Sequence, residues 1–359
     1  MTVATRTQVV EGGATRAPSP PRALLPVLGA VAFVVCAFCA GLAIGPVHIG
    51  VGEIIRSAAS HLPLLGVKSH LSATDSAILW QLRAPRVVLG LLVGGMLALA
   101  GGSYQGVFRN PLVDPYLLGV AAGAGLGATI AIAYAGSAVE SYDLLPLAAF
   151  AGAALGVAIA YVLGTSAGGG RSPAALVLAG VTVVSFLTAI QTFIQQQHTQ
   201  SLQEIYSWIL GRLDTAGWHD VVLVAPYIVV SASVILIHRR LLDVLAVGDE
   251  EAATLGVNVK RVRLTIVVFA TVGTAAAVAV SGLIGFVGII VPHAVRLMIG
   301  SSYRIVLPLS LLAGGGFLVL ADVIARTVVS PAELPIGVVT AFFGAPFFAI
   351  VLRTSRSFT

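Results

Sequence analysis

The sequence predicts an all-α, polytopic membrane protein, because apolar runs fill it and charged residues are scarce throughout. Hydrophobic residues make up 57% of the 359 positions and charged residues 10%, whereas ordinary soluble domains carry about a quarter charged residues. The runs are continuous rather than alternating, and a run of about 20 apolar residues crosses a bilayer as a helix. Most of the 40 glycines lie inside these runs, which predicts closely packed helices.

We expect about ten transmembrane helices in a single membrane domain that occupies residues 24–353. The predicted spans are residues 24–44, 86–106, 116–135, 144–164, 174–195, 220–237, 263–281, 282–299, 305–326 and 335–352. Pro292 is expected to bend or break the eighth span. Short surface helices are predicted at 51–59 and 202–210. The polar ends, 1–23 and 354–359, are expected to be cytoplasmic tails, the first of them disordered.

The basic residues predict that both termini are cytoplasmic. With the N-terminus inside, fourteen Lys and Arg residues fall on inner segments and six on outer ones, as the positive-inside rule requires. This asymmetry accounts for the formal net charge of +5, and the basic residues form no long stripe that would bind nucleic acid. Residues 239–262 form the most polar inner connection.

This inner connection contains a segment whose pattern predicts a short amphipathic helix. The residues concerned are Gly248, Asp249, Glu250, Glu251, Ala252, Leu255 and Gly256. Asp249 is placed to cap the start of the helix, the two glutamates follow in its first turn, and Gly256 can end it in a left-handed conformation. The helix either docks in a groove of a soluble partner or lies on its own membrane domain as a solvated connector.

Arginines mark the outer side. Arg83 and Arg86 flank a proline at the outer mouth of the second span, where they suit either an acidic patch on an extracytoplasmic partner or lipid headgroups. Asp322 and Arg326 stand four residues apart in the ninth span. They fit a proton or ion relay or a structural ion pair, and the scarcity of other acids within the spans favours the ion pair.

The fifth span carries a polar stripe. Its members are Thr188, Gln191, Thr192 and Gln195, which share one helical face. The stripe either lines a permeation path or hydrogen-bonds to neighbouring helices.

No motif in the sequence predicts catalysis. The Gly-rich stretches lack the Lys and Ser or Thr of a phosphate-binding Walker loop, and there is no G-x-S-x-G or H-E-x-x-H arrangement. Histidines show no paired metal-ligand spacing, and Cys36 and Cys39 are expected to be ordinary residues of the first span. We therefore expect no enzymatic activity, no bound metal and no cofactor in this chain, so that any ATP would be hydrolysed by another subunit.

Several long stretches resemble the FecCD family of permeases, which belong to ABC importers of iron-siderophores, haem and cobalamin. They are QLRAPRVVLGLLVGGMLALAGGSYQGVFRNPLVDPYLLGVAAGAGLGA, LAGV, WILGRLDTAGW, AVGDEEAATLGV, SGLIGFVGIIVPHAVRL and LADVIARTVVSPAELPIGVVTAFFGAPFF. They occur in family order between residues 81 and 348, so the resemblance covers nearly the whole chain beyond the first span.

The resemblance implies the membrane subunit of a type II importer in the cell membrane, with a fold like that of the cobalamin permease. Its implied partners are a second permease subunit, identical or related, two cytoplasmic ATPases that bind ATP-Mg, and an extracytoplasmic binding protein. The implied substrate is an iron chelate such as a ferric siderophore, or haem, carried by alternating access. A cobalamin importer is the alternative within the family, and an ion-coupled secondary transporter is the alternative outside it.

The resemblance also implies roles for individual positions. Residues 248–257 match the coupling region that touches the ATPase. Three arginines, at 83, 86 and 326, match positions where the cobalamin permease meets acidic residues of its binding protein, which places Arg326 near the outer surface. Ser172, Pro173 and Ala174 match the cytoplasmic gate at the start of the fifth span, although Pro173 replaces a small polar residue there.

Overall fold

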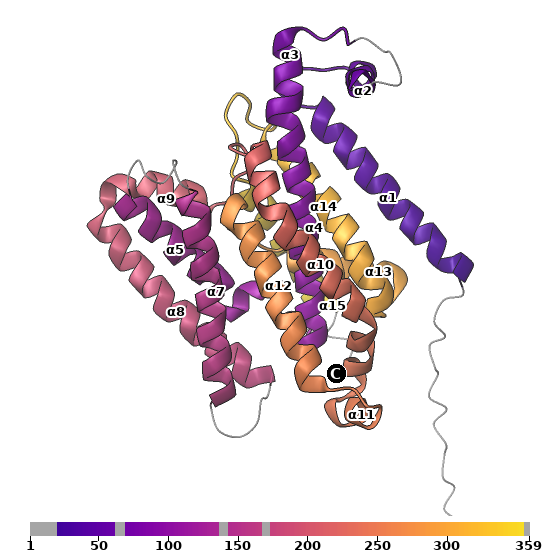
Figure 1. Ribbon diagram of the computed structural model, residues 1–359, viewed down its shortest axis with the longest axis vertical. Helices are drawn as coiled ribbons and strands as arrows, with labels where there is room; N and C mark the ends of the chain where they lie inside the picture. The colour runs from indigo at the N-terminus through magenta and orange to yellow at the C-terminus, as the bar shows by residue number, and fades with distance from the viewer. Residues whose placement is uncertain (1–19, 62–68, 136–142, 167–172, 355–359) are drawn as a thin grey trace, which may run out of the picture.

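The computed structural model describes residues 20–61, 69–135, 143–166 and 173–354, and helices make up most of this part of the chain (Figure 1). The longer helices are α1 (Pro20–Ala43), α4 (Ala84–Phe108), α7 (Leu144–Ser166), α8 (Pro173–Gln197), α10 (Trp218–Val247), α12 (Val259–Ser281), α14 (Tyr303–Ala325) and α15 (Ile336–Thr354). The shorter ones are α2 (Val51–Ser60), α3 (Ala73–Ala77), the π-helix η1 (Ile78–Arg83), the 3-10 turns η2 (Pro115–Leu118) and η3 (Thr199–Ser201), α5 (Val120–Ala135), α9 (Leu202–Ile209), α11 (Asp249–Thr254) and α13 (Val287–Ile299). The all-α prediction is confirmed, since the described residues contain no strand.

In the described part of the chain, ten apolar helices correspond to the ten predicted spans. Seven are long and apolar enough to cross a membrane, and Val120–Ala135, Val287–Ile299 and Ile336–Val351 are shorter apolar helices. The surface helices predicted at 51–59 and 202–210 are present as α2 and α9. Long apolar segments were predictable because backbone groups in lipid must hydrogen-bond within their own helix.

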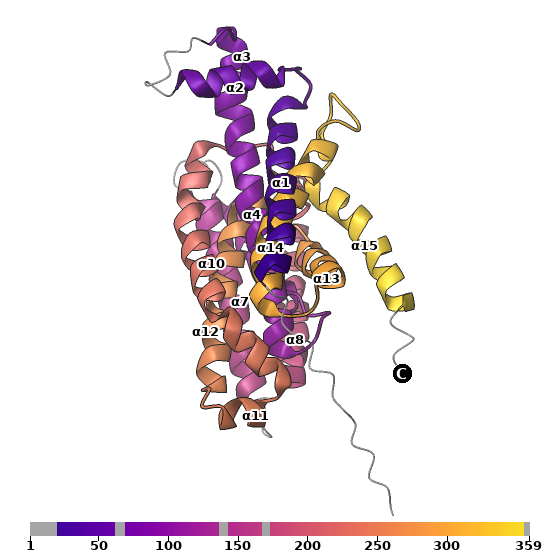
Figure 2. The ribbon, with the colours of Figure 1, turned by 90° about the vertical axis from the view of Figure 1, so that its right-hand side faces the viewer.

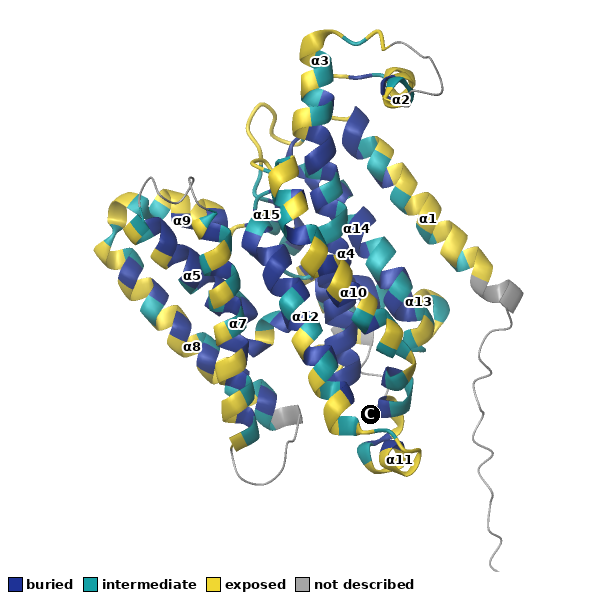
Figure 3. Cartoon of the chain, in the orientation of Figure 1, coloured by how far each residue is buried: buried dark blue, intermediate teal, exposed yellow. Residues whose placement is uncertain are grey.

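Helix α4 forms the centre of the molecule and is almost entirely buried (Figures 1 and 3). It packs against α10, α12, α13 and α14, while α5, α7 and α8 form a neighbouring group that joins this core through α12. Glycines allow the close contacts: a Cβ on Gly101 would collide with the backbone carbonyl of Gly288, and a Cβ on Gly94 with that of Gly314. Small residues at such crossings let two backbones touch.

The second span differs from the prediction at its N-terminal end. It was expected to start at residue 86, but α3, η1 and α4 form one continuous helical rod, Ala73–Phe108. Pro85 lacks a backbone N–H, which normally interrupts a helix. Here it falls in the first turn of α4, directly after the π-helical stretch, where the missing donor is tolerated. Arg83 and Arg86 therefore lie within a helix rather than beside a loop.

Two further boundaries also differ from the prediction. Helix α10 continues to Val247, so it includes residues 239–247 of the polar connection that was expected to begin at residue 239. Helix α13 is intact at Pro292, and the break in the eighth span comes earlier, at residues 282–286. Gly282 and Phe286 have positive φ angles of 67° and 69° there, which end the helical path before α13 begins.

Helix α1 lies along one side of the bundle and diverges from it toward its N-terminal end (Figures 1 and 2). It begins at Pro20, before the predicted start at residue 24, and its N-terminal half is largely exposed (Figure 3). The rest of the predicted N-terminal tail, 1–19, and the end of the chain, 355–359, lie outside the described residues.

Candidate functional site

Two of the three arginines predicted to face an outer partner, Arg86 and Arg326, pair with one buried carboxylate, that of Asp322 in α14. Arg86 in α4 donates to Asp322 through Nε at 3.0 Å and Nη2 at 2.7 Å, and to Glu333 through Nη2 at 2.8 Å. Arg326 lies 3.6 Å from Asp322, which confirms the ion pair predicted from their spacing. Asp322 is only 2% exposed, so its charge is offset by these arginines inside the protein.

These groups form an arginine cluster, which consists of Arg83, Arg86, Asp322, Arg326 and Glu333. Its other contacts connect α1 to the core. Arg83 donates to the carbonyls of Leu42 and Ala43 at 2.8 and 3.2 Å and also to that of Val47. Arg326 donates to the carbonyl of Gly41. These carbonyls belong to the last turn of α1 and the residues after it, so the arginines satisfy groups that a helix end leaves unpaired.

The cluster differs in accessibility from residue to residue. The side chain of Arg86 is 11% exposed and that of Glu333 36%, whereas Arg83 and Arg326 are 5% and 3% exposed. With three arginines and two carboxylates, the group retains a positive charge of one. Sequence reasoning missed the partnership of Arg86 with Asp322 and Glu333, because these residues are far from it along the chain.

At the opposite end of the bundle, the predicted coupling segment forms helix α11 between α10 and α12 (Figure 1). Gly248, with φ 149° and ψ 157°, is the N-cap residue, and Asp249 is the first residue of the helix rather than its cap. The carboxylate of Asp249 instead binds Arg263 of α12 at 3.1 Å and Arg109, at the end of α4, at 3.3 Å. Gly256 has φ 79° and ends the segment in the left-handed conformation that was predicted.

The faces of α11 have different environments. Ala252 is completely buried against the bundle, while Glu250, Glu251 and Leu255 are exposed, Leu255 to 69%. An exposed leucine beside two free carboxylates, on a helix anchored by ion pairs, is a suitable contact surface for a soluble protein.

The polar stripe of α8 is divided between two environments. Gln191 is buried toward α5, where a Cβ on Gly125 would lie 3.0 Å from its Oε1. Thr188 and Thr192 are exposed, and the Thr192 hydroxyl donates to the Thr188 carbonyl at 2.9 Å. Gln195 is partly exposed. One side of the stripe therefore packs against a neighbouring helix, and the other side is exposed on the surface of this chain.

The predicted gate lies at the edge of the described residues. Ser172 is outside them, and α8 begins at Pro173, followed by Ala174. Among the residues that the structure describes, no three His, Cys, Asp or Glu side chains are grouped so that they could hold a metal ion. Both cysteines are free and exposed on α1.

Comparison with known proteins places this chain among transport proteins. The sequence model of the FecCD transport family matches residues 33–354. A cobalamin import system permease protein of Halobacterium salinarum is 43% identical over 281 residues, which are 78% of this chain and 74% of the relative. An Fe(3+)-citrate import system permease protein of Bacillus subtilis is 38% identical over 312 residues, 86% of this chain and 92% of the relative.

A solved structure supports the same assignment. It is described as a metal-chelate type ABC transporter in an inward-facing conformation, and it superimposes with a TM-score of 0.80 at 27% identity. The match covers 94% of this chain and 100% of the other. The family model covers the arginine cluster and also the helices α8 and α11, since all of them lie within residues 33–354. This chain belongs to the FecCD transport family.

Proposed function

We propose that this chain is the membrane-spanning permease subunit of an ATP-driven importer, with an iron chelate such as a ferric siderophore, or haem, as its substrate. Helix α11 is the observation that carries the proposal. It presents Leu255 and Glu250 to solvent, while Asp249 joins it to α12 and to the end of α4. A soluble motor that moves this helix would therefore move the central helix of the bundle.

The proposed assembly contains a second permease subunit, identical or related, two ATPases and an extracytoplasmic binding protein. ATP-Mg binds the ATPases, and this chain holds no cofactor and hydrolyses no ATP. Both termini are cytoplasmic in this arrangement, so the α11 end faces the cytoplasm and the arginine cluster faces outward. The positive-inside distribution of Lys and Arg supports this orientation.

The translocation path is proposed to run beside α8, between this chain and the second permease. The exposed Thr188 and Thr192 and the partly exposed Gln195 would supply its polar lining, with the gate at residues 172–174. Alternating access follows when the ATP-bound and ATP-free states favour opposite openings of this path.

The binding protein is proposed to dock at the arginine cluster. Arg86 is the most accessible of the three arginines, and the positive charge of one that remains would attract acidic groups. Arg83 and Arg326 are buried, so they would not touch the binding protein directly. They would contribute to the positive charge of the cluster and hold α1 in place.

Cobalamin is a second candidate substrate. It is favoured by the 43% identity with the cobalamin permease of Halobacterium salinarum. Siderophores, haem and cobalamin are all bulky chelates, so the substrate must be measured directly.

The decisive test is reconstitution of the chain with its ATPase and binding protein in liposomes. ATP-dependent uptake of a ferric siderophore, haem and cobalamin is measured in parallel, and we expect one of the first two to accumulate. Accumulation of cobalamin alone would select the second candidate. Uptake driven by an ion gradient without the ATPase would instead indicate a secondary transporter and overturn the proposal.

Leu255→Glu tests the coupling helix in the same liposomes. We expect ATP-dependent uptake to fall about tenfold or more while ATP hydrolysis continues, because the exposed leucine would be a central apolar contact with the ATPase. Leu255→Ile, which keeps an apolar side chain, is the control and should retain most of the uptake. Normal uptake by Leu255→Glu would remove α11 from the coupling role.

A further inference from the structure

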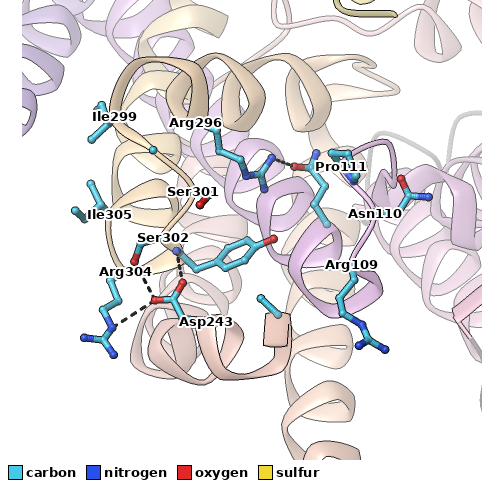
Figure 4. A pocket seen from close by; sticks show the side chains of 14 residues that line it. Arg109, Asn110, Pro111, Asp243, Arg296, Ile299, Ser301, Ser302, Arg304 and Ile305 are labelled. Carbon is cyan, nitrogen blue, oxygen red and sulfur yellow. Dashed lines mark hydrogen bonds and ion pairs between the residues drawn. The ribbon is translucent and has the colours of Figure 1, made fainter. Parts of the chain in front are cut away.

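A basic cavity opens at the α11 end of the bundle, between the ends of α4, α10 and α13 and the start of α14 (Figure 4). Its volume is about 880 Å³. Three arginines, Arg109, Arg296 and Arg304, line it together with one carboxylate, that of Asp243. The proposed transport path does not use this cavity, and the coupling helix reaches it only through the ion pair between Asp249 and Arg109.

The carboxylates near the cavity are already engaged by other groups. Asp243 accepts from the Ser302 hydroxyl at 3.0 Å and the Tyr303 backbone N–H at 2.6 Å, and it pairs with Arg304 at 3.3 Å (Figure 4). Arg109 pairs with Asp249, which also binds a second arginine. These contacts leave no carboxylate for the remaining arginine.

Arg296 is that arginine, and it has no ion-pair partner among the described residues. Its Nη1 donates to the Oε1 of Gln105 at 2.5 Å, and its guanidinium lies 5.5 Å from the ring centroid of Tyr303. Its Nη2 is buried and has no hydrogen-bond partner. The side chain as a whole is only partly buried and lines the cavity, so an anion bound in the cavity would offset a charge that no carboxylate of the described residues neutralises.

An apolar crevice adjoins the basic cavity. It has a volume of about 590 Å³ and separates the N-terminal half of α1 from α13 and α14, with Leu25, Phe33 and Met298 in its wall. A Cβ added at Gly29, which also lines it, would meet no atom within 4 Å. Ile299, at the end of α13, lines both the crevice and the basic cavity, so the two spaces are neighbours on either side of this residue.

We propose that these two adjoining spaces bind one anionic glycerophospholipid, with its phosphate at Arg296 and an acyl chain between α1 and α13. Arginine and phosphate form strong charge-assisted hydrogen bonds, and basic pockets between transmembrane helices suit anionic headgroups. The crevice decides between a lipid and a soluble anion, because only a lipid would fill apolar space next to the charge. The lipid comes from the leaflet on the α11 side, which is the cytoplasmic leaflet in the orientation proposed above.

Native mass spectrometry of the full chain, with dioleoyl phosphatidylglycerol or dioleoyl phosphatidylcholine added, tests this site. We expect the wild type to retain the anionic lipid in preference to the zwitterionic one. Arg296→Gln should weaken phosphatidylglycerol retention about tenfold or more, the effect of losing a charged hydrogen bond. Arg353→Gln, which removes an exposed arginine from the last turn of α15, is the matched control and should retain the lipid.

Gly29→Leu tests the acyl part of the site without altering any arginine. It places a side chain in the open crevice, so phosphatidylglycerol retention should fall while binding of soluble glycerol 3-phosphate stays unchanged. Equal retention of phosphatidylglycerol by the wild type and Arg296→Gln would overturn the proposal. Glycerol 3-phosphate binding as strong as that of the lipid, with Gly29→Leu without effect, would overturn the lipid as occupant.

Folding of the variants is checked by thermal unfolding. Where Arg296→Gln shows no cooperative transition, Arg296→Lys and Gly29→Leu decide the question. The lysine keeps the charge but not the planar donor geometry, so it should retain the lipid more weakly than the wild type and still prefer it over phosphatidylcholine. Unchanged lipid retention by both of these variants would count against the site.

Discussion

Asp322 is the residue that organises the end of the bundle opposite α11. Its carboxylate is buried and receives both Arg86, from α4, and Arg326, from its own helix. Those two arginines connect it in turn to Glu333 and to the end of α1. Removal of one member of a buried ion-pair network leaves the other charges uncompensated, which costs more than the pair contributes when complete.

Asp322→Asn should therefore destabilise the protein strongly. We expect a loss of about 3 kcal/mol or more in the free energy of unfolding, measured by denaturant titration in detergent. Glu333→Gln removes a half-exposed partner of Arg86 and should cost less than about 1 kcal/mol. Equal losses for the two variants would show that Asp322 has no special role.

Asp114, in the connection between α4 and η2, predicts a pH dependence of stability. Burial raises the pKa of its carboxyl to about 6, although hydrogen bonding from the Tyr116 backbone N–H lowers it. The folded protein thus keeps a proton that the unfolded chain releases, so stability falls as the pH rises from about 4 to 6. Ionisation of this one group then costs about 3 kcal/mol above that window.

Asp114→Asn removes the ionisation while it keeps an acceptor for the Tyr116 N–H. The Tm of this variant relative to the wild type should therefore increase as the pH is raised from 4 to 7. Thermal unfolding in detergent across this range measures the difference. A difference in Tm that stays constant with pH would contradict the prediction.

Some contacts between residues could be predicted from the sequence and others could not. Asp322 and Arg326 are four residues apart on one helix, so their pairing follows from helical geometry. Arg86 and Asp322 are 236 residues apart, and only the packing of α4 on α14 brings them together. The position of Arg296 in a cavity likewise depends on where α13 ends beside α4.

At the scale of single helices, α4 depends on glycines for its central position. Gly101 lies against the backbone of Gly288 in α13, so a Cβ at residue 101 requires the two helices to separate. Overpacking of this kind costs typically 1–3 kcal/mol. The glycines were predicted to pack helices closely, but their partners became known only from the fold.

Gly101→Ala should lower the free energy of unfolding by about 2 kcal/mol, as measured by denaturant titration. Gly29→Ala is the matched control, because its Cβ meets nothing within 4 Å and alanine favours helix. We expect that control to be neutral or slightly stabilising. Wild-type stability in Gly101→Ala would mean that α4 and α13 are not closely packed.

Helix α11 shows what local pattern can and cannot predict. Its acidic first turn and its glycine stop indicated a helix, and both are present. The role of Asp249 was misassigned as a cap, because Arg263 and Arg109 lie beside its carboxylate in the folded chain. A charged hydrogen bond to arginine is stronger than one to a backbone N–H, so the tertiary contact prevails.

At the scale of the whole molecule, the orientation in the membrane yields a direct test. In a Cys36→Ser, Cys39→Ser background, single cysteines are placed at two exposed positions, Leu255 directly after α11 and Val328 two residues after Arg326 of the arginine cluster. A membrane-impermeant thiol reagent added to intact cells should label the cysteine at position 328 and not the one at 255. Labelling of position 255 from outside would reverse the orientation and exclude the ATPase contact.

The sequence by itself determined the all-α membrane architecture, the approximate spans and the position of α11. Apolar runs long enough to cross a bilayer must satisfy their backbone hydrogen bonds locally. Such helices can therefore be recognised in the sequence without knowledge of the helices that pack against them. Only the tertiary structure decided which charges meet at Asp322, that α3 to α4 form one rod, and that a basic cavity and an apolar crevice lie next to each other at Ile299. These features arise from contacts between helices distant in the chain, which no local pattern encodes.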